Sequence, residues 1–124
     1  MLIKEDGYKV NFIDVNDVFV GYDTSTDCCE DADWCITDFI IDSYSVLSKY
    51  LESPASNFKP DVDDFEFNPQ FGEMHNDGMD GGGIAVFMLV GPGNKTLFLH
   101  LYNIHNGYYG HGFESNTILG DDCL

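Results

Sequence analysis

Two apolar runs separated by a tight turn constrain the fold of this chain more than any other feature of its sequence. Residues 84–90 are continuously apolar, and residues 96–105 form a second apolar run after the turn sequence GPGN at 91–94. Apolar runs of this kind are typical of strands that are covered on both faces, by another layer or by a helix. We therefore expect two adjacent antiparallel strands at the centre of the fold.

Further strands are expected on either side of this pair. Residues 8–13 and 15–22 alternate between apolar and polar side chains, which predicts a hairpin with its turn at 14–17. Residues 34–41 suggest a third strand. The dipeptide Asn106-Gly107 is typical of a hairpin turn because both positions tolerate positive φ, so residues 108–113 are expected to pair back as a last strand.

One short helix is predicted between these strands. Its apolar face has helical spacing and comprises Val46, Leu47, Tyr50 and Leu51. Asp42 or Ser43 can cap its N-terminus, and Pro54 prevents its continuation. Such a short helix needs a sheet to pack against.

These elements predict one α+β domain covering residues 1–124. We expect an antiparallel sheet of five or six strands with one short helix packed on a face. Residues 53–83 are rich in proline, glycine and acidic residues, and this stretch is expected to be a flexible acidic Gly-rich loop, in which residues 62–67 hint at a short strand.

Net charge restricts the partners of the chain. Twenty-two acidic residues oppose five basic ones, all of them lysines, and the formal net charge is −17. Nucleic-acid phosphates and anionic membranes would be repelled, and the chain lacks the arginines that recognise phosphate and guanine in a bidentate manner. The charge therefore favours a basic protein as partner, such as one that itself binds nucleic acid; the alternative is that it only maintains solubility.

The acidic residues expected to contact such a partner lie in the Gly-rich stretch. They are Asp61, Asp63, Asp64, Glu66, Glu73, Asp77 and Asp80. The spacing of the acidic residues in this stretch does not match the twelve-residue calcium loop, so a solvated acidic loop is the preferred interpretation.

The cysteines suggest a metal site. No signal peptide is recognised at the N-terminus, so we expect an intracellular, reducing compartment in which metal binding or burial is favoured over disulfides. The predicted ligands of a structural Zn²⁺ are Cys28, Cys29, Cys35 and His105. The alternative for Cys35 is simple burial, since it lies between Trp34 and Ile36.

Catalysis finds little support in the sequence. Cys28 or Cys29 with His105 could form a nucleophile and base, but there is no nucleophile elbow, phosphate loop or HExxH motif. We predict that the protein is not an enzyme, and no catalytic residue is assigned.

Two motifs resemble those of a family of small domains found mostly in bacteriophages. They are the sequence DCCE at 27–30, followed by an apolar strand and a short helix, and the sequence NGYY at 106–109, which follows an apolar strand through Tyr102. The likeness covers roughly residues 8–52 and 84–113. The family commonly has a histidine shortly before DCCE, where this chain has the sequence TST at 24–26, so no ligand role is transferred from that histidine.

A small acidic phage protein without a catalytic motif also resembles anti-CRISPR proteins. This resemblance implies an inhibitor in the host cytoplasm that binds the basic surface of a CRISPR effector nuclease of the single-protein, RNA-guided type. Its carboxylates would block nucleic-acid loading by charge mimicry, without direct contact to nucleic acid or membrane. The alternative is a zinc-stabilised structural or accessory phage protein with no inhibitory role.

Overall fold

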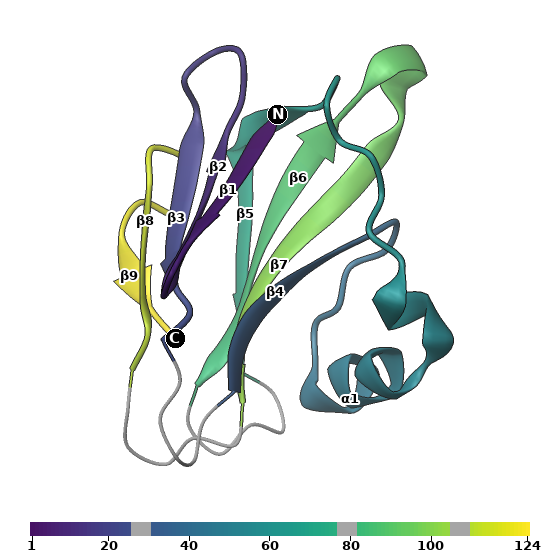
Figure 1. Cartoon of the computed structure of the whole chain (residues 1–124), viewed down its shortest axis with the longest axis vertical. Helices are drawn as coiled ribbons and strands as arrows, with labels where there is room; N and C mark the ends of the chain where they lie inside the picture. The colour runs from purple at the N-terminus through teal and green to yellow at the C-terminus, as the bar shows by residue number, and fades with distance from the viewer. Residues whose placement is uncertain (26–30, 77–81, 105–109) are drawn as a thin grey trace.

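The strands form two antiparallel sheets that face each other, and one α-helix packs beside the second sheet (Figure 1). The computed structural model describes residues 1–25, 31–76, 82–104 and 110–124. The α+β class is confirmed. The expected single sheet is replaced by two sheets of five and four strands, because apolar residues of both sheets share one core between them.

Sheet A has the spatial order β1-β2-β3-β8-β9. Its strands are β1 (Leu2–Asp6), β2 (Lys9–Ile13), β3 (Phe19–Asp23), β8 (Gly112–Ser115) and β9 (Asp122–Cys123). The expected hairpin is confirmed by β2 and β3, whose buried residues Val10, Phe12, Val20 and Tyr22 face the core.

β1 was not predicted by the sequence analysis, and β8 was predicted with the wrong partner. β1 has few apolar residues, and its pairing with β2 depends on the register from Leu2↔Ile13 to Asp6↔Lys9. β8 was expected to pair back onto the second apolar run, but it pairs with β3 in sheet A, with Tyr22 opposite Phe113. The Asn106-Gly107 turn lies outside the described residues.

Sheet B has the spatial order β4-β7-β6-β5. Its strands are β4 (Asp31–Thr37), β7 (Thr96–Ile104), β6 (Gly83–Val90) and β5 (Glu66–His75). The two apolar runs form β6 and β7 at its centre, paired from Gly83↔Asn103 to Val90↔Thr96, as expected. Between them lies the short 3₁₀ turn η2 (Pro92–Asn94), where Gly93 has a φ of 68°.

Both faces of sheet B are buried, which explains the absence of alternation in its central strands. Phe87 and Leu99 belong to the core shared with sheet A, whereas Val86 and Tyr102 belong to a second cluster on the outer face. Each face therefore selects apolar side chains.

α1 (Tyr44–Glu52) covers part of this outer face. Ser43 is its N-cap, with Oγ accepting a hydrogen bond from the Val46 N–H at 3.3 Å, and Leu47 is completely buried. After Ser53 the chain continues as η1 (Pro54–Asn57), as the position of Pro54 requires. No helix in the described part of the chain has the length and apolarity needed to span a membrane.

The expected flexible loop at 53–83 is interrupted by a ten-residue strand. β5 pairs with β6 along the edge of sheet B, and its register shifts between Asn68 and Glu73. Phe65 and Phe67 are buried in the shared core, which anchors the strand despite its polar composition. The short strand suggested at 62–67 overlaps only the start of β5, and the rest was missed because the register shift and Pro69 disrupt the alternation.

Candidate functional site

The predicted zinc ligands can be placed only in part. Cys28, Cys29 and His105 lie outside the described residues. Cys35 lies on β4 among the apolar residues of the outer cluster, where burial and, to a smaller extent, the Asp33 carboxylate raise the pKa of its thiol to about 12. In the part of the chain that is described, no group of three or more metal-ligating side chains occurs. The zinc site stays a prediction.

The predicted partner-binding carboxylates are described only in part, and the binding role stays a prediction. Asp61, Asp63, Asp64 and Glu66 are exposed and lie close together in the sequence, at the start of β5 and just before it. Glu73 is seven residues further along, roughly 20 Å at the usual rise of a strand, and its Oε1 lies 3.3 Å from Nε2 of His75. Asp77 and Asp80 lie outside the described residues.

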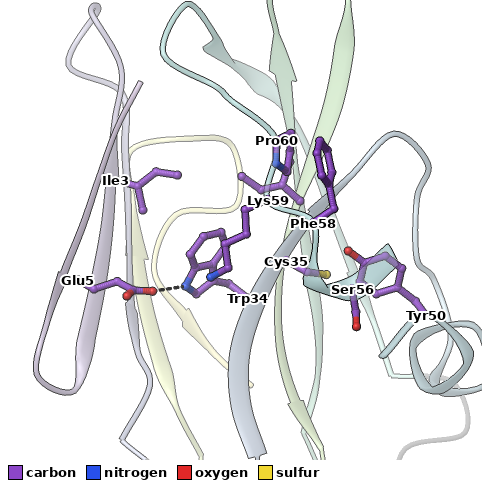
Figure 2. Close-up of a pocket in the computed structure, with 10 residues that line it drawn as sticks. Ile3, Glu5, Trp34, Cys35, Tyr50, Ser56, Phe58, Lys59 and Pro60 are labelled. Carbon is purple, nitrogen blue, oxygen red and sulfur yellow. Dashed lines mark hydrogen bonds between the residues drawn. The ribbon is translucent and has the colours of Figure 1, made fainter. Parts of the chain in front are cut away.

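A different set of side chains converges where the open edges of the two sheets meet. Trp34 of β4 donates a hydrogen bond from its indole Nε1 to Oε1 of Glu5 in β1, at 3.1 Å (Figure 2). The Trp34 ring also contacts Phe12 edge-on, with the ring centroids 5.2 Å apart. Because Trp34 and Glu5 belong to different sheets, this contact joins the sheets at their open side.

The chain's own Lys59 supplies a cation to this ring. Its Nζ lies 4.4 Å from the centroid of the Trp34 ring, a cation–π contact (Figure 2). The indole therefore contacts a carboxylate at its edge and an ammonium at its face, while Phe58 and Ile3 line the cavity beside it.

Three neighbouring cavities extend along β4. The first, of about 300 Å³, is lined by Glu5, Asp31, Asp33 and Trp34 among others. The second, of about 330 Å³, shares Glu5 and Trp34 and reaches Ile36, and the third, of about 280 Å³, continues from Ile36 to Phe39. We call this set of cavities the β4 groove.

One end of the β4 groove is lined by three carboxylates and one lysine, Lys9, so its formal charge is negative. Partial desolvation and the neighbouring carboxylates of Asp31 and Glu5 raise the pKa of Asp33, whereas the Trp34 N–H and Lys59 oppose this shift. The Trp34 backbone N–H donates to Asp33 Oδ1 at 2.9 Å. A cationic group placed here would relieve the repulsion between the carboxylates.

Sequence reasoning missed this site because its parts are distant in the chain. Glu5 is 29 residues from Trp34, and no local pattern predicts that β1 and β4 lie at the same open side. The available signal was the sequence DADW at 31–34, which places two carboxylates and the only tryptophan of the chain on one strand.

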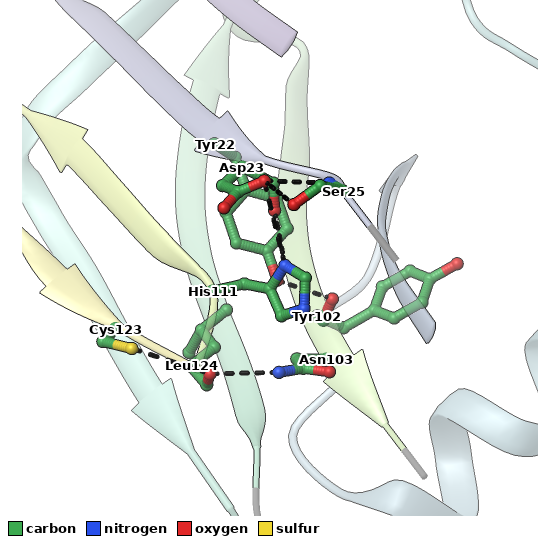
Figure 3. A network of polar contacts seen from close by, with 8 residues as sticks. All are labelled: Tyr22, Asp23, Ser25, Tyr102, Asn103, His111, Cys123 and Leu124. Carbon is green, nitrogen blue, oxygen red and sulfur yellow. Dashed lines mark hydrogen bonds and ion pairs between the residues drawn. The ribbon is translucent and has the colours of Figure 1, made fainter. Parts of the chain in front are cut away.

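A second polar cluster lies where β3, β7 and β8 approach the C-terminus (Figure 3). Tyr22 Oη donates to the carbonyl oxygen of Tyr102 at 2.9 Å, and the Asn103 side chain donates to the Leu124 carbonyl oxygen at 3.0 Å. The ring of buried His111 lies with Nδ1 3.1 Å from the Asp23 carbonyl oxygen. These bonds connect sheet A, sheet B and the C-terminus, so we assign this cluster a structural role.

Two shifted pKa values agree with that role. Burial raises the pKa of the Tyr22 hydroxyl far above its usual range. For Asp23, partial burial acts to raise the pKa of the carboxyl group. Hydrogen bonds from the hydroxyl and backbone N–H of Ser25 act in the opposite direction, and the pKa is lowered overall. Both groups therefore keep their ordinary protonation state at neutral pH.

Comparison with protein-family models, with curated proteins and with solved structures gave no match to this chain.

Proposed function

We propose that this protein is an inhibitor that binds the basic surface of a nucleic-acid-handling protein and excludes nucleic acid from it. One observation carries the proposal. Among the described residues, no lysine forms an ion pair with a carboxylate, and the recorded pairs of this kind are His75–Glu73 and His111–Asp23. The described carboxylates thus lack a lysine in direct ion-pair contact, although Lys9 and Lys59 act on Asp23 and Asp33 from a longer distance, and the exposed carboxylates remain accessible to a cationic partner.

The β4 groove is the best candidate for the contact. Its three carboxylates, Glu5, Asp31 and Asp33, lie beside an aromatic ring that already accepts a cation. At the alternative segment, the Met1 amino group donates to the Val62 and Asp63 carbonyl oxygens, which places a positive charge beside the carboxylates there. The groove also contains lysines, Lys9 in the acidic cavity and Lys59 over Trp34, so what distinguishes it from the alternative segment is the aromatic ring beside its carboxylates.

A channel that binds RNA or DNA is lined with lysine and arginine, and such a channel attracts a protein of charge −17 over a long range. The resemblance to anti-CRISPR proteins supports a specific target, a single-protein, RNA-guided CRISPR nuclease in the host cytoplasm. By occupying the channel, the inhibitor would prevent loading of the guide RNA or of the DNA target.

The test measures guide loading and DNA cleavage by such nucleases, with the purified protein added at about 0.05 and 0.5 M salt. We expect inhibition that weakens steeply with salt, because screening shortens the range of charge. Inhibition that is independent of salt, or no binding to any basic nucleic-acid-binding protein at the lower salt concentration, would contradict the proposal.

Two variants of equal charge identify the surface. The groove variant combines Glu5→Gln, Asp31→Asn and Asp33→Asn, and its matched control combines Asp61→Asn, Asp63→Asn and Asp64→Asn. We expect the groove variant to lose about tenfold or more in affinity and the control only a few-fold, since contacting charges contribute more than distant ones. Equal losses would show that the contact is diffuse and not centred on the groove.

A further inference from the structure

The hydrogen-bonding pattern of sheet B shows where the main-chain groups of its edge strand β4 point. At the β6–β7 turn, the Gly91 N–H donates to the Lys95 carbonyl oxygen at 2.8 Å. Hydrogen-bonded and non-bonded pairs alternate in an antiparallel ladder, so the odd-numbered residues of β7 bond to β6 and the even-numbered ones bond to β4.

Alternate residues of β4 therefore direct their N–H and C=O groups away from the sheet. Ala32, Trp34 and Ile36 face odd-numbered β7 residues and so direct their groups to the outer edge, where Ala32 and Ile36 are themselves buried at the floor of the groove. The Trp34 N–H agrees with this assignment, because it donates to the side chain of Asp33 and not to a main-chain group of β7. No backbone hydrogen bond joins residues 55–60 to β4 within the described chain, although these residues line the groove.

The other edge of sheet B is protected. β5 contains Pro69 and a register shift, and the Ile118 N–H donates to the Pro69 carbonyl oxygen at 2.8 Å. Leu119 packs so closely over Gly72 that any side chain at position 72 would collide with the Leu119 side chain. Proline, irregularity and a covering segment are devices that block pairing at an edge. β4 contains neither proline nor a register shift. Its edge is flanked by the carboxylates of Asp31 and Asp33 and by the side chains of Phe58, Lys59 and Pro60, which line the same groove without pairing to its main chain.

Carboxylates on an edge strand repel acidic strands, and they disfavour apolar strands because pairing would remove water from the charge. They attract basic strands. The wall of the β4 groove combines these carboxylates with Glu5, while the Trp34 ring is suited to a lysine or arginine side chain, as its contact with Lys59 illustrates.

We propose that β4 takes up an extended basic segment of the partner protein by strand addition. The segment pairs with the outward main-chain groups of Ala32, Trp34 and Ile36 and takes the Trp34 N–H from the Asp33 carboxylate. One of its lysine or arginine side chains replaces Lys59 over the Trp34 ring (Figure 2). Lys59 is then an internal substitute that is displaced on binding. This inference rests on the proposed function and specifies how its partner is recognised.

Trp34 is the only tryptophan, so its fluorescence reports on the groove of the whole protein. The probe is a short acetylated and amidated peptide of alternating arginine and valine. Its control has the same sequence and charge but carries N-methyl groups on both the valine and the arginine main-chain amides, which removes the donors from both edges of the peptide. We expect the unmethylated peptide to change the Trp34 emission and to bind about tenfold tighter than the control.

Protein variants test the role of Lys59. Lys59→Met keeps the apolar stem and removes the competing cation, so it should tighten peptide binding by about two- to fivefold beyond its matched control. The control is Lys49→Met, which makes the same charge change on an exposed position of α1.

The outcomes separate the two proposals. If the methylated and unmethylated peptides bind equally, or Lys59→Met equals Lys49→Met, strand addition over Trp34 is overturned, while salt-sensitive nuclease inhibition would still stand. If neither peptide binds at low salt and no nuclease is inhibited, the proposed function itself fails.

Discussion

His100 is a polar residue enclosed by an apolar environment. It lies on β7 and is completely buried, and its Nε2 accepts a hydrogen bond from the Ile41 backbone N–H at 2.9 Å. The other ring nitrogen, Nδ1, is buried without a hydrogen-bond partner among the described residues. Burial lowers the pKa of His100 to about 4, so the ring is neutral at physiological pH.

The buried His100 should make stability depend on pH. In the unfolded chain a histidine titrates near pH 6.5, so between about pH 6.5 and 4 the unfolded state binds the proton and the folded state does not. The unfolding free energy should therefore decrease as pH falls, by roughly 3 kcal/mol for this group between pH 7 and 4. Urea unfolding of the wild type and of His100→Gln, which keeps an acceptor for the Ile41 N–H, measures the difference. An equal pH dependence in the two proteins would contradict the prediction.

At the scale of elements, the β2–β3 connection is joined to the opposite sheet by one carboxylate. Asp14 is buried, and its Oδ1 accepts hydrogen bonds from the N–H groups of Asn16 at 2.8 Å and Val18 at 3.0 Å. Its Oδ2 accepts from the Phe67 N–H of β5 at 2.9 Å. The turn of sheet A and the first part of β5 are therefore fixed to each other by the same side chain.

Replacing Asp14 by Asn should weaken this junction. An amide has one acceptor oxygen, so its NH₂ group would face a backbone N–H, and one donor would lose its partner. We expect a loss of roughly 1–3 kcal/mol in the unfolding free energy, measured by chemical denaturation. The matched control is Asp17→Asn in the same turn, where φ is 62° and Asn is well tolerated. A similar loss in both variants would mean that the loss of charge, and not the buried hydrogen bonds, is responsible.

At the scale of the whole molecule, the uncompensated negative charge should oppose folding. A net charge of −17 on a chain of 124 residues causes self-repulsion that is larger in the compact state than in the unfolded chain. Sodium chloride screens this repulsion.

Raising sodium chloride from about 0.02 to 0.3 M should thus raise the melting temperature by a few degrees, while it weakens binding to a basic partner. Calorimetry of the wild type and of the variant with Asp61, Asp63 and Asp64 replaced by Asn tests this, since the variant should respond less to salt. A melting temperature that falls with salt would show that attractive charge pairs dominate.

The parts of the fold that the sequence predicted are those determined by neighbouring residues. The β6–β7 hairpin follows from two apolar runs around a turn, and α1 follows from its apolar spacing, the cap at Ser43 and the stop at Pro54. Turn chemistry and periodicity act over a few residues, so they can be recognised without knowledge of the rest of the chain.

Tertiary structure alone decided which strands share a sheet and which edges remain free. β1 and β5 lack clear alternation and exist because a neighbouring strand supplies hydrogen bonds, and β8 pairs with β3 across more than 90 residues of chain. The β4 groove depends on the same long-range pairing, since Glu5 reaches Trp34 only when the open edges of the two sheets coincide. Composition alone favoured a positively charged partner, which stays a prediction, whereas the position of the acidic groove is set by contacts between residues remote in sequence, which no local pattern encodes.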